Sequence, residues 1–283
     1  MNILIILFKL CSLLPLSFLR LIFYFLYFIN KYIFKYRYST VLHNLTIVFP
    51  NKDIIELEVL RDLFYKHFFN LIAEIVKLMS ASKSFINKEV EIVNPEIIEQ
   101  FLAKNKSVIL LSGHYNNWEW GFTKVALSFN KPCVGIYKTI NSKLINNILM
   151  RIRQRFGTRL ISMQDSVRYI INNKENCQII GIIADQNPVV DQTTNWMSFF
   201  GEKVPVFMGA EKLAKKLDFP VIFGKMEKDI FNKYYIKFEV IESNPRNSLD
   251  GNITKNYFER LEEQINNQPL YWLWTHRRWK HKQ

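Results

Sequence analysis

The chain has 283 residues, of which 49% are hydrophobic and 22% are charged, and its formal net charge is +13 at pH 7. This length and composition suit one or two globular domains, and they exclude a disordered tail or a fibrous protein. The surplus of Lys and Arg favours an anionic partner, which could be nucleic acid, an acidic lipid surface or an acidic carrier protein.

Cysteine and histidine spacing argues against metal binding. The three cysteines, Cys11, Cys133 and Cys177, show no paired spacing, so neither a disulfide framework nor a zinc cluster is indicated. The five histidines also lack a familiar pattern of metal ligands. The sequence therefore predicts no metal site.

Residues 1–35 are expected to form an N-terminal membrane anchor. The first 30 are almost wholly apolar, interrupted by Lys9, Pro15 and Arg20. A spanning helix needs roughly 20 apolar residues, and an arginine at mid-depth is costly unless it snorkels. A true span, a shallow tilted helix and a buried core helix all stay open. If the helix spans, the basic stretch "KYIFKYRY" at 31–38 predicts that the body lies in the cytoplasm.

Residues 36–283 are expected to form a single α/β domain. After an amphipathic helix over 54–79, short apolar runs alternate with helical patterns, which is typical of a largely parallel sheet flanked by helices. The expected strands are 107–112, 132–137, 159–163, 177–184, 220–226 and 234–241. The expected helices between and after them are 118–127, 142–156, 166–172, 207–217 and 254–267. The last strand alternates polar and apolar residues, which favours an antiparallel edge strand.

The stretch "GHYNNWEW" at 113–120 carries the candidate chemistry. His114 follows the strand 107–112, and ligands of such sheets bind at the carboxyl ends of the strands. Asn116 or Asn117 can cap the next helix, and Glu119 lies in its first turn. A chain that turns from strand into helix can bring Glu119 back to His114, giving a His–carboxylate dyad that works as a general base. A structural histidine with a capping glutamate is the alternative.

The same stretch resembles the His-(four residues)-acid motif of glycerolipid acyltransferases, and its Gly-His-x-x-Asn-Trp-Glu form resembles the late acyltransferases of bacterial lipid A biosynthesis. The resemblance covers nearly the whole chain, because further motifs follow in family order. These are "YRYSTVLHNLTIVFP", a helix leading into Glu74, "RQRFGTRLIS", "IIADQNP", "SFFG" and "YWLWTHRRWK".

The resemblance implies a glycerolipid-acyltransferase-like fold and transfer of a fatty acyl chain from acyl carrier protein, or a similar thioester donor, to a hydroxyl of a lipid A precursor. It implies His114 as the general base and Glu119 as its orienting partner, with no further cofactor. The residues expected to bind substrate are Asn117, Arg153, Arg155, Asp185 and Gln186. Solvated basic residues and a capping Asp185 are the bland alternatives.

The expected location is the inner membrane, with the catalytic domain facing the cytoplasm. The expected partners are acyl carrier protein, the acceptor lipid and the membrane, without nucleic acid. Two other functions stay open: the same chemistry on another acceptor lipid, such as an amino-acid-containing lipid or a glycolipid, and a non-enzymatic, basic, membrane-tethered binding module.

Overall fold

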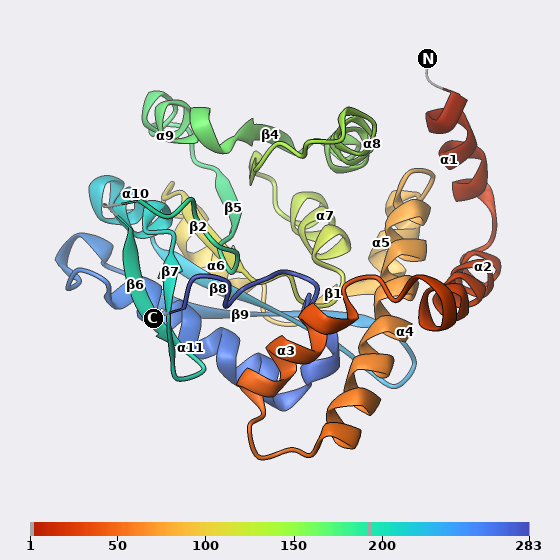
Figure 1. Ribbon diagram of the computed structural model, residues 1–283. Coiled ribbons are helices and arrows are strands. Elements are labelled where there is room, and N and C mark those ends of the chain that lie inside the picture. The colour runs from red at the N-terminus through yellow and green to blue at the C-terminus, as the bar shows by residue number, and fades with distance from the viewer. Residues whose placement is uncertain (1–2, 192–193, 283) are drawn as a thin grey trace.

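The computed structural model describes residues 3–191 and 194–282 and has an α/β architecture (Figure 1). The helices are α1 Ile3–Leu13, α2 Leu16–Ile29, α3 Tyr38–Val48, α4 Ile54–Leu78, α5 Lys83–Glu89, α6 Glu96–Leu102, α7 Trp118–Ser128, α8 Lys143–Gln154, α9 Met163–Asn172, α10 Gly209–Leu217 and α11 Asn252–Asn267. Short helical turns are η1 Asn30–Phe34, η2 Pro245–Asn247 and η3 Pro269–Tyr271. The strands are β1 Val90–Ile92, β2 Val108–Ser112, β3 Cys133–Tyr137, β4 Arg159–Ser162, β5 Ile179–Ile183, β6 Asn195–Phe199, β7 Glu202–Val206, β8 Val221–Lys228 and β9 Tyr234–Glu242.

The main sheet confirms the expected α/β class with a mostly parallel sheet. Within the described residues it has seven strands in the order β1-β9-β8-β2-β5-β3-β4, and β8 with β9 is its antiparallel pair. The prediction that β9 forms an edge was wrong, because β1 pairs with it in parallel and covers it. Three-residue β1 is too short to leave a clear periodic pattern in the sequence.

Helices pack on both faces of this sheet and bury two separate apolar cores. Successive side chains of a strand point to opposite faces, so Ile109 and Leu111 of β2 join one core while Val108 and Leu110 join the other. The first core includes residues of α3, α4, α10, α11 and the C-terminal segment. The second includes residues of α5, α6, α7 and α8. Because both faces of β2 are buried, its sequence is an almost continuous apolar run.

Helix α4 illustrates how local sequence sets an element. Asp53 accepts a hydrogen bond from the backbone N–H of Glu56 at 2.8 Å, and the Glu56 side chain accepts one from the Asp53 N–H at 3.2 Å. This reciprocal capping box fixes the start of the helix that the sequence predicted. By contrast, the antiparallel hairpin of β6 and β7 was not predicted, because its strands carry Asn195, Glu202 and Pro205 among their apolar residues.

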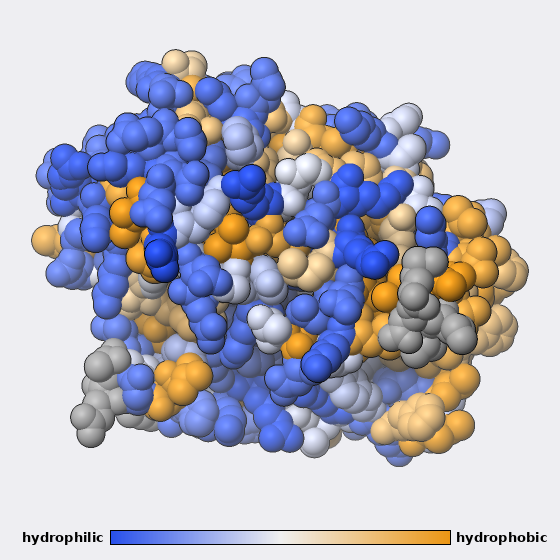
Figure 2. All heavy atoms as spheres, turned by 90° about the horizontal axis from the view of Figure 1, so that it is seen from above, coloured by the Kyte–Doolittle hydropathy of each residue, from blue (hydrophilic) through white to orange (hydrophobic). Residues whose placement is uncertain are grey.

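The N-terminal helices α1 and α2 lie beside α4 (Figure 1). Among the described residues, one helical segment, Leu16–Phe34, is long and apolar enough to cross a membrane, and only 17% of its apolar window is buried. The single charged residue of α2, Arg20, faces the body and pairs with Glu74 of α4 at 2.7 Å. Figure 2 shows hydrophobic residues gathered on the side of the molecule where α1 and α2 lie. Residues 1 and 2 of the expected anchor lie outside the described part.

The C-terminal segment is tied to α3 by a buried asparagine. Nδ2 of Asn44 donates to the carbonyl oxygens of Trp274 at 2.8 Å and His276 at 2.7 Å. Nearby, Arg37 donates to the carbonyl oxygen of Thr275 at 2.8 Å. These bonds hold a segment without regular structure against α3.

We expect Asn44→Ala to destabilise the protein, because two carbonyl groups lose their donor in a buried site. The loss should be about 1–3 kcal/mol in the free energy of unfolding, measured by urea denaturation. Thr46→Ala is the matched control, since Thr46 is exposed on the same helix and its hydroxyl donates only within α3. Equal stability of the two variants would contradict the role given to Asn44.

Candidate active site

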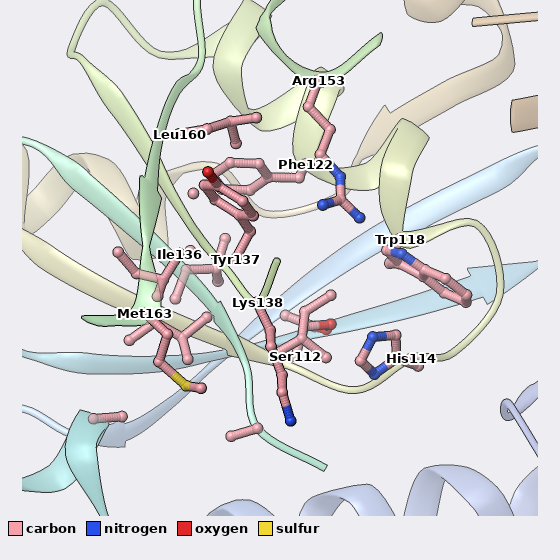
Figure 3. Close-up of a pocket in the computed structure, with 18 of the residues that line it drawn as sticks. Ser112, His114, Trp118, Phe122, Ile136, Tyr137, Lys138, Arg153, Leu160 and Met163 are labelled. Carbon is pink, nitrogen blue, oxygen red and sulfur yellow. The ribbon is translucent and has the colours of Figure 1, made fainter. Parts of the chain in front are cut away.

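A cavity of about 510 Å³ opens where β2, β3, β4 and β5 reach their carboxyl ends. Ligands of parallel sheets bind at this edge. Figure 3 shows its two parts: apolar side chains, including Phe122, Ile136, Leu160 and Met163, gather on one side, and His114 lies on the other. The cavity therefore combines an apolar interior with a small number of polar groups.

His114 binds Asp185, which follows the neighbouring strand. Nδ1 of His114 lies 2.6 Å from Oδ1 of Asp185, and the His114 backbone N–H donates to Oδ2 at 3.0 Å. Nε1 of Trp272 also donates to Oδ2, at 2.8 Å. An ionised carboxylate only accepts hydrogen bonds, so Nδ1 carries the proton and the lone pair of the neutral ring lies on Nε2. The His114 side chain is 20% exposed, which leaves it accessible from the cavity.

Asp185 is 2% exposed and ionised. Burial acts to raise the pKa of its carboxyl group, but the positive charge that His114 carries when it is protonated and the hydrogen bonds from His114 and Trp272 lower that pKa to about 2. A fixed carboxylate on Nδ1 holds the ring orientation and stabilises the imidazolium that forms when Nε2 takes a proton. The pair has the geometry of a general base with its orienting group.

The expected dyad of His114 and Glu119 is corrected by this geometry. Glu119 is turned the other way, and its carboxylate accepts hydrogen bonds from Nε of Arg153 at 2.9 and 3.1 Å and from Nη2. Glu119 sits in the first turn of α7, and residues five positions apart along the chain do not face each other across one helical turn. The partner of His114 comes instead from residue 185.

Arg153 is the predicted arginine that reaches the cavity. Burial alone would lower the pKa of Arg153, but the charge of Glu119 and its hydrogen bonds together outweigh burial and raise that pKa. No hydrogen bond of its Nη1 is found within the described residues, and Figure 3 shows the guanidinium turned toward Trp118 and His114. Glu119 thus holds a guanidinium whose remaining N–H groups are available to a substrate.

The other predicted substrate residues separate into two groups. Gln186 lines the cavity. Arg155 does not, because its Nη1 donates to the carbonyl oxygens of Leu78 and Ala81 at the end of α4 and beyond it. Asn117 is fully buried; its Oδ1 accepts from the Trp120 N–H at 3.0 Å and caps α7. Arg155 and Asn117 therefore hold the protein together around the cavity and do not face it.

Sequence reasoning gave no separate role to Trp118, Phe122, Lys138 or Trp272. The Trp118 ring meets the His114 ring edge to face, with centroids 5.0 Å apart. Exposed Lys138, at the cavity rim after β3, forms no ion pair within the part of the chain that the structure describes. The motif "YWLWTHRRWK" was a signal for Trp272.

Across residues 3–191 and 194–282, no group of three or more His, Cys, Asp or Glu side chains could hold a metal ion.

Asp185→Asn should lower the free energy of unfolding at pH 5 by on the order of 2 kcal/mol. The pKa of Asp185 lies below its ordinary value of 3.8, so its stabilising contribution is present above that value and is lost as the pH falls through about 2. The difference between the unmodified chain and the variant should therefore shrink from about pH 5 to pH 3 in denaturation series. A constant difference over this range would contradict the assignment. Exposed Asp165→Asn serves as the control.

The chain is similar to known proteins in two comparisons. A curated "Lipid A biosynthesis acyltransferase" from Haemophilus influenzae (strain ATCC 51907 / DSM 11121 / KW20 / Rd) is 23% identical over 173 residues, which are 61% of this chain and 54% of that protein. The match thus spans about half the length of the curated relative. The sequence profile of the bacterial lipid A biosynthesis acyltransferase family matches residues 1–281. Since this match covers nearly all 283 residues, the chain belongs to the bacterial lipid A biosynthesis acyltransferase family.

Proposed function

We propose that this protein is a membrane-associated O-acyltransferase, which transfers a fatty acyl chain from a thioester donor, acyl carrier protein, to a hydroxyl of a lipid A precursor. The observation that carries the proposal is the His114–Asp185 pair at the mouth of an apolar cavity. Membership of the family supports the reaction class and the acceptor.

The pair supplies the proton transfers of acyl transfer. Nε2 of His114 takes the proton of the acceptor hydroxyl as its oxygen attacks the thioester carbonyl carbon. The tetrahedral intermediate collapses, the carbon–sulfur bond breaks, and the imidazolium returns the proton to the leaving thiolate. Ester and free thiol are the products. Asp185 stays ionised throughout, because the positive charge develops next to it.

Arg153 is suited to the negative charge that builds on the carbonyl oxygen. A fixed donor aimed at that charge lowers the barrier by about 3–4 kcal/mol in comparable acyl-transfer sites. Glu119 fixes the guanidinium through Nε and Nη2, which leaves Nη1 for the substrate. Glu119 in this proposal positions Arg153, and Asp185 takes the role that was expected of Glu119.

The apolar part of the cavity is suited to a fatty acyl chain. Phe122 of α7 lies across the sheet where β3 and β5 carry Gly135 and Gly181. A Cβ at Gly181 would lie 2.3 Å from the Phe122 ring, and one at Gly135 would lie 3.3 Å from it. The two glycines therefore make room for a ring that lines the apolar part of the cavity, where the end of an acyl chain would lie.

Charge and exposed apolar surface support the expected partners. A net charge of +13 suits an acidic carrier protein and a phosphorylated glycolipid. The exposed hydrophobic residues of α1 and α2 (Figure 2) form a surface suited to the membrane. We propose that the protein lies at the inner membrane with its cavity on the cytoplasmic side, because the basic residues that follow α2 favour the cytoplasmic side of a membrane.

His114→Ala should abolish acyl transfer, because the acceptor hydroxyl loses its base. Asp185→Asn should lower kcat by about 10²- to 10⁴-fold, as expected when the orienting carboxylate of a catalytic histidine is neutralised. The purified full-length chain in detergent micelles is given an acyl carrier protein thioester and a panel of acceptor lipids. Mass spectrometry then reports which lipid gains one acyl chain.

His43→Ala is the matched control for this experiment, since His43 is an exposed histidine on α3. Unchanged turnover in His114→Ala would remove the proposed base. Acylation of a lipid outside lipid A biosynthesis, and not of the lipid A precursor, would shift the function to the alternative acceptor. No turnover by the unmodified chain with any donor and acceptor, together with binding of an anionic partner that is lost when Lys and Arg are replaced, would favour the binding-module alternative.

Phe122→Ala should shift the donor preference toward longer acyl chains, because removal of a ring that lines the apolar part of the cavity enlarges that part. One methylene in an apolar pocket is worth about 1–3 kcal/mol of discrimination, so the shift is measurable by competing thioesters of different chain length. Leu127→Ala, at a partly buried position on the same helix outside the cavity lining, is the control. An unchanged ranking of chain lengths in Phe122→Ala would place the chain end elsewhere.

A further inference from the structure

Glu74 is a buried carboxylate that joins four side chains from separate parts of the chain. Its Oε1 accepts from Nη2 of Arg20 at 2.7 Å and lies 3.8 Å from Nζ of Lys228. Its Oε2 accepts from Nδ2 of Asn117 at 2.9 Å and from the Tyr234 hydroxyl at 2.7 Å. A single residue of α4 therefore links α2, the start of α7, β8 and β9.

The carboxylate is charged despite complete burial. Burial acts to raise the pKa of Glu74, but the charges of Lys228 and Arg20 and hydrogen bonds from Arg20 and Tyr234 lower it below its ordinary value. Removal of one partner from a buried ion pair is costly, because the other charge is left uncompensated. The partners of Glu74 are thus held in fixed positions relative to one another.

Asn117 connects Glu74 to the candidate active site. Its amide nitrogen is bound to Glu74 while its Oδ1 caps α7. The next two residues are Trp118, whose ring packs on His114, and Glu119, which holds Arg153. The indole N–H of Trp120 also donates to the backbone oxygen of Glu74, at 3.0 Å. The first turn of α7 is therefore attached to α4 at two points.

Arg20 carries the same constraint to α2, the helix with the exposed apolar face. It is the only charged residue of that helix, and it points inward to Glu74. Large exposed side chains of α2 point away from the body; they are Phe18, Leu21, Ile22, Phe25, Leu26 and Ile29. The position of α2 on the body and the position of the catalytic turn thus share one carboxylate.

We propose that Glu74 is a positioning residue for the acyl-transfer site. Through the two oxygens of Glu74, the position of helix α2 on the body controls the geometry of the turn 113–119. This inference rests on the proposed function. Without Arg20, the remaining cation on Oε1 is Lys228 of β8, which draws the carboxylate away from Asn117. The first turn of α7 then loses one of its two attachments to α4, and Trp118 and Arg153 shift relative to His114.

The test is a double-mutant cycle in kcat on the full-length chain, with a fatty acyl carrier protein thioester and a lipid A precursor in detergent micelles. Arg20→Ala removes the partner of Oε1. Asn117→Ser removes the donor to Oε2 but keeps a good N-cap. Each single change should lower kcat about tenfold or more while KM for the donor stays nearly constant, as expected for a misplaced catalytic group. The two effects should be less than additive, although Arg20 and Asn117 do not hydrogen-bond each other.

Lys31→Ala is the matched control. Lys31 pairs with Asp62 of α4 at 2.7 Å, so this variant also removes an ion pair between the N-terminal segment and α4. Asp62 lies nearer the start of α4 than Glu74, which binds Asn117. It should keep kcat within about twofold, while Arg20→Lys should restore most of the activity that Arg20→Ala loses. Thermal unfolding of each variant verifies that the chain is folded.

Strict additivity in the cycle, or equal losses of kcat in Arg20→Ala and Lys31→Ala, would overturn the coupling through Glu74. The proposed function is judged separately by His114→Ala. If that variant is inactive and the cycle is additive, only the positioning role fails. If that variant turns over normally, the proposed function itself fails.

Discussion

The hydrogen bond between His114 and Asp185 depends on the pairing of two neighbouring strands. In the parallel register of β2 and β5, Ser112 lies opposite Ile183. Each chain then leaves the sheet at the same level, and two residues later one supplies the imidazole and the other the carboxylate. Sheet hydrogen bonds therefore set a distance that the chemistry needs. The indole of Trp272, from the end of the chain, completes the carboxylate's partners.

This dependence explains which parts could be predicted from the sequence. The strands and helices around the cavity followed from apolar runs and from caps, and His114 was recognisable as a polar residue at the end of a buried strand. Its partner was not recognisable, because strand order is a long-range property: β5 lies next to β2 although β3 and β4 come between them in the chain. A carboxylate five residues away was the nearest in sequence, but its helix directs it toward Arg153.

In the N-terminal segment, the partner of Arg20 was likewise not recognisable from the sequence. Its composition predicted an apolar surface, and Arg20 was a difficulty for any helix placed wholly in lipid. The fold resolves that difficulty by placing Arg20 on the inner side of α2, against a glutamate 54 residues away. Composition reports how apolar a helix is, but the partner of its one charge depends on tertiary packing. The exposed face of α2 and its inner face consequently have different tasks.

Three buried carboxylates surround the turn from His114 to Glu119, and each has its own donors: Asp185 binds the histidine, Glu119 binds Arg153, and Glu74 binds the helix cap. Asn116 within that turn has a left-handed backbone (φ 52°), which asparagine tolerates better than most residues. Its amide nitrogen donates to the Met226 carbonyl at 3.2 Å. A shift of the turn would take a donor away from at least one of these buried carboxylates, and the loss of a partner of a buried charge is costly. The requirement that every buried carboxylate stay paired therefore keeps the turn rigid, so the base and the cation stand in position before substrate arrives.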